Sequence, residues 1–221
     1  MIPTVPQPIS TAAVSDAMDS LHLAGWLRGI SARVPTAAVC GPAYTVTYRG
    51  VDPVKGFRGA ANYIDDVPDG AVVIIDNGGS TAITTWGSLL TTVARARGIA
   101  GTVIHGAARD IGEIRAHHFP LFSTAVGMTS GKNRVELAGI GLAVNIHGVG
   151  VHPGDLIVAD DNGVIAVPAA RAAEVLRRAH NVALTEERIA KLVASGVRLD
   201  EARRRLGYDQ PWKCQASPER I

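Results

Sequence analysis

Apolar residues recur with two different periods along the chain, and each change of period predicts a change between helix and strand. In residues 11–21 the apolar side chains lie three or four positions apart, which predicts a helix with Ser10 or Thr11 as its N-cap. The run GPAYTVTYRG at 41–50 alternates and is rich in β-branched and aromatic residues, so it predicts a strand. The first part of the chain therefore contains both kinds of element.

A strand–helix–strand–helix order follows. The run AVVII at 71–75 comes after a Pro-Asp-Gly turn, which indicates a buried strand. Helical spacing over 84–97 stops at Gly98, and IAGTVIHG at 99–106 reads as the next strand. RDIGEIRAHHF at 109–119 is predicted to be a short helix with acidic residues in its first turn. This order is typical of a sheet with helical crossovers.

The pattern changes twice more towards the C-terminus. Residues 120–168 form short β-rich pieces separated by Gly, Pro and Asp, with no helical period. From Ala169 onward a long apolar stripe predicts helices. We therefore expect one mixed α/β core domain at 1–175 and a C-terminal helical extension at 176–221, which packs on the core or on a neighbouring subunit.

Composition narrows the class of protein. The 221 residues carry 22 Lys and Arg against 20 Asp and Glu, a balance that does not favour nucleic acid as a partner. The longest apolar runs have the length of strands, which argues against a membrane partner. Cys40 and Cys214 lack the spacing of a metal or disulfide motif, and the first residues do not resemble a signal peptide. We expect a cytoplasmic protein.

The segment HGAARDIGE at 105–113 holds the first candidate for chemistry. Arg109 and Asp110 directly follow a predicted strand, at the end of a sheet where ligands of α/β proteins commonly bind. A guanidinium suits a carboxylate or phosphate, and a carboxylate suits Mg²⁺ or Mn²⁺. The alternative is that Asp110 caps the following helix while Arg109 is solvated.

A second candidate is NGGSTAITTWGSLL at 77–90, which also follows a strand and leads into a helix. Free backbone N–H groups at Gly87, Ser88, Leu89 and Leu90 would form an anion seat at that helix N-terminus. The alternative is an ordinary glycine-rich turn. If both loops lie at the ends of neighbouring strands, together they suit a small oxo-acid.

Histidines offer weaker candidates. His105 is either a proton donor near this loop or a half-buried histidine with a structural hydrogen bond. His147 and His152 flank GVGV, where they either form a metal-binding pair or have no ligand role.

The run WGSLLTTVARARGIAGTVIHGAARDIGEIRAHHFPLFS resembles the RraA-like family. Further matching blocks are VSDAMD, GPAYTV, PDGAVVIIDNGG and VHPGDLIVADDNGVIAVP, so that the resemblance spans most of residues 10–180. The family includes regulators of ribonuclease activity and 4-hydroxy-4-methyl-2-oxoglutarate aldolases, which also decarboxylate oxaloacetate. The resemblance implies a mixed β/β/α sandwich similar to the swivelling phosphohistidine domain, assembled as a homotrimer or hexamer with active sites between subunits.

The resemblance also implies roles for the two loops. The backbone at Gly87–Leu90 and the Arg109 side chain would bind a pyruvyl group, and Asp110 would hold Mg²⁺ or Mn²⁺. Retro-aldol cleavage and β-decarboxylation both leave a pyruvate enolate, which the metal and Arg109 would stabilise. The implied enzyme is a class II pyruvate aldolase, a metal-dependent carbon–carbon lyase with a small 2-oxo-acid substrate.

One position departs from the family pattern. The aldolases carry Asp or Glu 21 positions before the arginine, whereas this chain has Ser88, which cannot act as a base or organise metal-bound water as a carboxylate does. Two alternatives therefore stay open. One is a non-catalytic regulator that binds a ribonuclease or another protein partner, and the other is a specialised-pathway lyase or isomerase that reuses the pyruvyl site.

Overall fold

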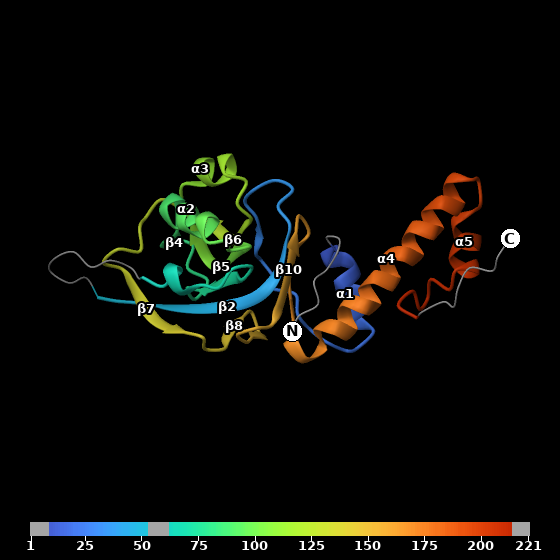
Figure 1. Cartoon of the computed structure of the whole chain (residues 1–221), viewed down its shortest axis with the longest axis horizontal. Helices are drawn as coiled ribbons and strands as arrows, with labels where there is room; N and C mark the ends of the chain where they lie inside the picture. Colours follow the sequence, from blue (N-terminus) through green and yellow to red (C-terminus); the bar gives the residue numbers. More distant parts are fainter. Residues whose placement is uncertain (1–8, 53–61, 214–221) are drawn as a thin grey trace.

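The computed structural model describes residues 9–52 and 62–213, and most of their strands join one sheet (Figure 1). Within these described residues the sheet has nine strands. Its members are β1 (Ser31–Ala32), β2 (Val39–Gly50), β3 (Val72–Asp76), β4 (Thr84–Trp86), β5 (Gly101–Ala108), β6 (Leu121–Val126), β7 (Val135–Ile140), β10 (Leu156–Asp160) and β11 (Gly163–Val167). A separate hairpin consists of β8 (Val144–Ile146) and β9 (Val149–Val151).

Helices lie at both ends of the molecule. They are α1 (Thr11–Asp19), α2 (Ser88–Ala96), α3 (Ile111–Ala116), α4 (Ala172–Ala194) and α5 (Leu199–Arg205), with short 3-10 turns at Ile64–Asp66 and Ala169–Arg171. None of the helices in the described part of the chain combines the length and the apolar character that a membrane span requires. Cys40 is an exposed free cysteine, and Cys214 lies outside the described residues.

The centre of the sheet is parallel. The strand order is β1-β6-β5-β3-β2-β10-β11, and β2, β3, β5 and β6 run in the same direction. Strands β3 and β5 are almost wholly buried, which explains why their sequences are continuous apolar runs rather than alternating ones. The predicted mixed α/β fold is confirmed, whereas the likeness to the phosphohistidine domain remains a prediction.

The segment 25–32 nearly closes the sheet into a barrel. At one end, the Leu27 N–H donates to Val164 O (2.9 Å) and the Ala166 N–H donates to Gly25 O (2.9 Å), so the segment pairs with β11. At its other end, β1 pairs with β6 on the opposite edge. Gly25 permits this approach, because a Cβ there would lie 2.2 Å from Ala166 O. We call residues 25–32 the closing segment.

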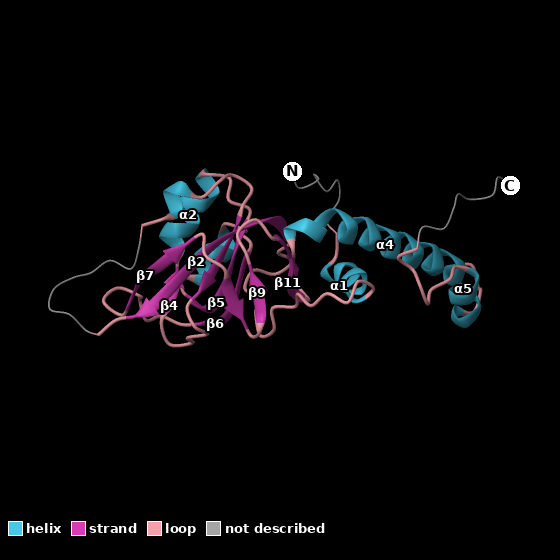
Figure 2. Cartoon of the chain, turned by 90° about the horizontal axis from the view of Figure 1, so that it is seen from below, coloured by secondary structure: helices cyan, strands magenta, loops and turns pink. Residues whose placement is uncertain are grey.

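The outer face of the β10–β11 hairpin carries a second layer, formed by α1 and the first half of α4 (Figures 1 and 2). Alternation along the hairpin divides its side chains between two cores. Ile157 and Val164 face the interior of the barrel, whereas Leu156 and Val158 pack against the helices. Asp160 anchors α1, because it accepts hydrogen bonds from the Thr11 N–H and hydroxyl (2.9 and 2.6 Å).

Most of the predicted elements are present. The helices at 11–19 and 88–96, the strands at 72–76 and 101–108, and the β-rich stretch after residue 120 agree with the expected pattern. The short strand β4 was not predicted, because its three residues lie inside a segment that reads as loop and helix. The division into domains stays a prediction, and the continuous helix α4 runs across its boundary at residue 175.

Candidate functional site

The two candidate loops meet at the ends of paired strands. Strand β4 pairs in parallel with β5, and Trp86 lies opposite Ala108. The next residues, Gly87 and Arg109, are therefore neighbours, and the Arg109 N–H donates to Trp86 O (3.0 Å). Gly87 is the N-cap of α2, so the helix N-terminus lies beside the Arg-Asp pair. The expected juxtaposition is confirmed, and it depends on the unpredicted strand β4.

The Asp110 side chain caps α2 and not α3, the helix that directly follows it. It occupies the N-cap position of α3, yet its side chain makes no capping hydrogen bond there and its φ is +57°. Instead its Oδ2 accepts from the backbone N–H of Ser88 (3.0 Å) and from the Ser88 hydroxyl (3.2 Å). Asp110 thus caps α2, in a left-handed conformation that Asp tolerates better than most residues.

The packing leaves room only for glycine at position 87. A Cβ on Gly87 would lie 2.5 Å from Asp110 Oδ2 and 3.3 Å from Arg109 Nε. Arg109 Nε lies 3.5 Å from Asp110 Oδ2, and the side chains of Arg109 and Asp110 are 36% and 30% exposed. The guanidinium therefore keeps access to solvent while one of its edges faces the carboxylate.

Among the described residues, two backbone donors in the first turn of α2 have no hydrogen-bond acceptor. The Ser88 N–H is used by Asp110, and the Thr91 N–H donates to Gly87 O (3.1 Å). The N–H groups of Leu89 and Leu90 lie between them in the first turn, where a helix has no internal acceptor to offer. The Leu89 side chain is 77% exposed. Of the four residues predicted to form the anion seat, Leu89 and Leu90 are the ones whose N–H groups could bind an anion.

A divalent cation fits this site only with help from water or substrate. Mg²⁺ is often held by one or two carboxylates while water and substrate oxygens complete its shell. Asp110 supplies one carboxylate, and among the described residues its Oδ1 accepts no hydrogen bond. Within the same residues, no group of three or more His, Cys, Asp or Glu side chains could enclose a metal ion. Asp110 therefore offers one metal ligand among these residues, and water or substrate oxygens would have to complete the shell of a Mg²⁺ or Mn²⁺ ion.

His105 belongs to a second polar cluster, at the end of β3. Its Nδ1–H donates to Asp76 Oδ1 (3.0 Å), and the Gly78 N–H donates to the same oxygen (2.9 Å). The ring of His147 packs edge-on against His105, with centroids 4.7 Å apart. His147 therefore meets His105, whereas the alternative partner His152 lies against Asp155 (3.5 Å). No local motif identifies this cluster, because strand pairing brings its members together.

The fold and the site define a mixed α/β protein in which a helix N-terminus and an Arg-Asp pair meet at the ends of parallel strands. The chain belongs to the RraA-like family, since the model described as Aldolase/RraA matches residues 11–166. This match confirms the family resemblance and includes both candidate loops.

Individual relatives support the assignment. Protein DlpA of Legionella pneumophila is 45% identical over 205 residues, which are 92% of this chain and 33% of DlpA. The chain thus spans about a third of the length of that relative. A 4-hydroxy-4-methyl-2-oxoglutarate aldolase of Thermus thermophilus is 35% identical over 100 residues, covering 45% of this chain and 60% of the relative. The crystal structure of an uncharacterized protein from Pseudomonas syringae pv. tomato has 43% identity and a TM-score of 0.83, covering 88% of this chain and 92% of that one.

Proposed function

We propose that this protein is a metal-dependent carbon–carbon lyase that cleaves a small 2-oxo acid through a pyruvate enolate. The observation that carries the proposal is the position of the Arg109 guanidinium beside the N-terminus of α2, with Asp110 between them. Family membership and the name of the Thermus thermophilus relative support the reaction class. Retro-aldol cleavage of 4-hydroxy-4-methyl-2-oxoglutarate and decarboxylation of oxaloacetate are the two reactions to test.

The substrate carboxylate would bind to the free donors of this site. The Leu89 and Leu90 N–H groups point out of the helix end, where the helix dipole favours a negative charge. Arg109 would add a charge-assisted hydrogen bond and would stabilise the oxygen that becomes negative in the enolate. The partial exposure of Arg109 lets a small substrate reach it without opening the core.

Asp110 would hold Mg²⁺ or Mn²⁺ through Oδ1, while Oδ2 stays hydrogen-bonded to Ser88. When bound, such a metal supplies Lewis-acid stabilisation of the enolate oxygen. The two hydrogen bonds from Ser88 fix the orientation of the carboxylate, so that its free oxygen is presented beside Arg109. The protein's own contribution is thus a positioned carboxylate and a positioned guanidinium.

None of these residues supplies a general base for the proposed reaction. Ser88 replaces the family acid, and its hydroxyl is directed to Asp110. We propose that a carboxylate from a neighbouring subunit takes this role in a homotrimer or hexamer located in the cytoplasm. Two inactive variants test this: Arg109→Met, and a variant in which an acidic residue of the N-terminal segment is neutralised. If subunits share a site, mixing the two variants would restore part of the activity.

The test is pyruvate release from each of the two substrates with Mg²⁺, with Mn²⁺ and with EDTA. We expect release that requires the metal and falls strongly in the Asp110→Asn variant. If no pyruvate forms from either compound at any metal concentration, the proposed reactions are wrong.

Ser88 favours one other candidate, a regulator that binds a protein partner such as a ribonuclease, because regulation does not need the missing acid. A partner that co-purifies with the wild type, combined with the absence of metal binding in calorimetry, would support this candidate over the lyase.

A further inference from the structure

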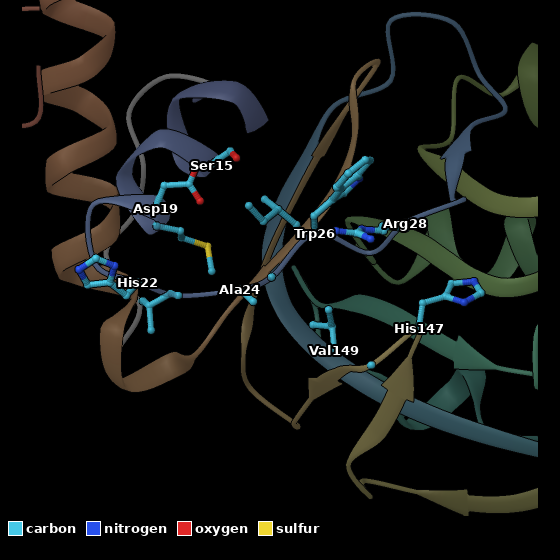
Figure 3. A pocket seen from close by; sticks show the side chains of 13 residues that line it. Ser15, Asp19, His22, Ala24, Trp26, Arg28, His147 and Val149 are labelled. Atoms are coloured by element: carbon cyan, nitrogen blue, oxygen red, sulfur yellow. The ribbon is translucent and has the colours of Figure 1, made fainter. Parts of the chain in front are cut away.

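A hollow of about 790 Å³ lies outside the candidate lyase site, between α1, the closing segment and the turn of the β8–β9 hairpin (Figure 3). Its volume is in the range of small-molecule sites. Arg28 and His147 line it on the side of the core, across from Ser15, Asp19 and His22 (Figure 3). Arg109, Asp110 and the first turn of α2 do not line this hollow.

Arg28 is a cation that is held in place but not neutralised. Its guanidinium lies over the ring of Trp26, 5.2 Å from the centroid, which restricts its motion through a cation–π contact. Stacking covers a face of the guanidinium and leaves its in-plane N–H groups free to bind an anion. Among the described residues no carboxylate forms an ion pair with Arg28. The closing segment therefore presents a positioned positive charge to the hollow.

His147 contributes a second donor on the same wall. Its φ is +50°, a left-handed turn conformation that histidine adopts more readily than most residues, and the turn is held by a hydrogen bond from the Gly148 N–H to Asn145 Oδ1 (2.9 Å). The imidazole rests against His105, which Asp76 orients. His147 is an exposed residue at the rim of the hollow, and the contact with His105 holds its ring in place.

Part of the remaining lining is apolar. Met18, Leu23, Trp26 and Ile165 give the hollow an apolar surface, and Trp26 is 55% exposed. An exposed tryptophan beside a cation is typical of ligand sites, because a flat ring can pack on it. A bare inorganic ion would leave this surface and most of the volume unused.

We propose that this hollow binds a small organic anion with a flat body, whose carboxylate or phosphate is held by Arg28 and His147 and whose body packs beside Trp26. At the far end of the ligand, the Ser15 hydroxyl on α1 would donate or accept a hydrogen bond and the Asp19 carboxylate would accept one. The site is separate from the proposed lyase site and does not depend on it.

Isothermal titration of the full chain with four probes tests the proposal: benzoate, adenosine monophosphate, inorganic phosphate and uncharged benzamide. We expect benzoate or adenosine monophosphate to bind more tightly than benzamide and inorganic phosphate. In Arg28→Met the affinity should fall about tenfold or more, since one charge-assisted hydrogen bond is lost. Arg177→Met is the matched control, because Arg177 is exposed on α4 and does not line the hollow.

Two further variants locate the ligand. Ala24→Trp fills the hollow from an exposed position of its lining and should abolish binding without removing a charge. His147→Asn keeps a residue that accepts positive φ and should weaken binding severalfold. Circular dichroism checks that each variant is folded.

Four outcomes would overturn the proposal. The first is that neither organic anion binds at millimolar concentration. The second is that benzamide binds as tightly as benzoate, which would remove the role of the charge. The third is that phosphate alone binds as tightly as adenosine monophosphate. The fourth is that Arg177→Met has the same effect as Arg28→Met.

Discussion

Two aspartates at the ends of neighbouring parallel strands make almost the same contacts in very different surroundings. Asp76 ends β3, and one of its oxygens accepts from the Gly78 N–H and from His105. Asp110 follows β5, and one of its oxygens accepts from the Ser88 N–H and hydroxyl. In each case a backbone N–H and a side chain share one carboxylate oxygen, so the hydrogen bonds alone do not tell which aspartate serves a ligand.

The residues around Asp76 and Asp110 distinguish the two aspartates. The His105 partner of Asp76 is only 8% exposed, so that this pair stabilises the interior. Asp110 has a guanidinium 3.5 Å away and the free N–H groups of a helix N-terminus beside it, at a position that solvent reaches. A carboxylate among unused donors suits substrate and metal, whereas a carboxylate that pairs with a buried histidine suits the fold. We expect the two clusters to respond to mutation in opposite ways.

The largest effect should come from Arg109→Met. This variant keeps an unbranched side chain that reaches about as far as Nε and removes the charge that would bind the substrate and stabilise the enolate. We expect pyruvate release, measured as kcat/KM, to fall about 100-fold or more, equivalent to roughly 3 kcal/mol of transition-state stabilisation.

The matched control for Arg109 is Arg97→Met at the other end of α2, where Arg97 is exposed at the C-cap. Activity of this control should stay within about twofold of wild type, since a surface change of this kind rarely affects a distant site. Equal losses in both variants would show that α2, and not the guanidinium, is responsible.

The same substitution in both aspartates tests the comparison directly. Asp110→Asn should lower pyruvate release about tenfold or more, because an amide binds Mg²⁺ poorly, while the free energy of unfolding changes by less than about 0.5 kcal/mol. Asp76→Asn should do the reverse. It replaces a charge-assisted hydrogen bond to a buried histidine by a neutral one, which costs about 1 kcal/mol, and it leaves kcat/KM unchanged.

Urea unfolding and steady-state kinetics on both variants give the four numbers that this test needs. His180→Ala on the exposed surface of α4 serves as a control for the general cost of altering a polar side chain. If Asp76→Asn lost activity and kept its stability, the second cluster would be the catalytic one.

Sequence patterns predicted the elements of this site better than its contacts. The strands at 72–76 and 101–108 and the helix at 88–96 follow from apolar periods, because burial on both faces or on one face leaves a local trace in the sequence. No apolar period or local motif in the sequence identifies the hydrogen-bond partner of Asp110. Local reasoning points to a cap on α3, whereas the observed donor, Ser88, precedes Asp110 by 22 residues.

The missing information is the register between strands. Strand β4 is only three residues long, too short for an apolar period to identify, yet its pairing with β5 places Gly87 against Asp110. The contact between His105 and His147 depends likewise on how the β8–β9 hairpin folds back on the sheet. Register is a property of pairs of distant segments, so one sequence read locally does not contain it.

A smaller effect is expected from Ser88→Asp, which places the family acid at its position. The new carboxylate would lie near Asp110 Oδ2, and repulsion between like charges at a partly exposed site should cost about 1 kcal/mol of stability in EDTA. A divalent cation between the two carboxylates would reverse the effect. Mg²⁺ should therefore raise the melting temperature of Ser88→Asp more than that of the wild type.

Ser88→Asn is the control for this variant, because it has a similar size and no charge. Thermal unfolding of the three proteins in EDTA and in Mg²⁺ completes the experiment. An identical response of all three to Mg²⁺ would mean that a carboxylate at position 88 does not share a metal ion with Asp110.

The smallest effect should come from Ser88→Ala, which removes one of the two hydrogen bonds that Asp110 accepts and keeps the other. The hydroxyl bond at 3.2 Å is lost while the backbone N–H at 3.0 Å still holds the carboxylate. We expect a loss of about 0.5–1 kcal/mol in the free energy of unfolding and a change in kcat/KM below about threefold. Ser195→Ala, whose hydroxyl donates to Leu192 O on the surface, is the reference for removing an exposed serine. A much larger loss of activity than of stability would show that the hydroxyl itself orients Asp110 for the reaction, and the site would then depend on the residue that departs from the family.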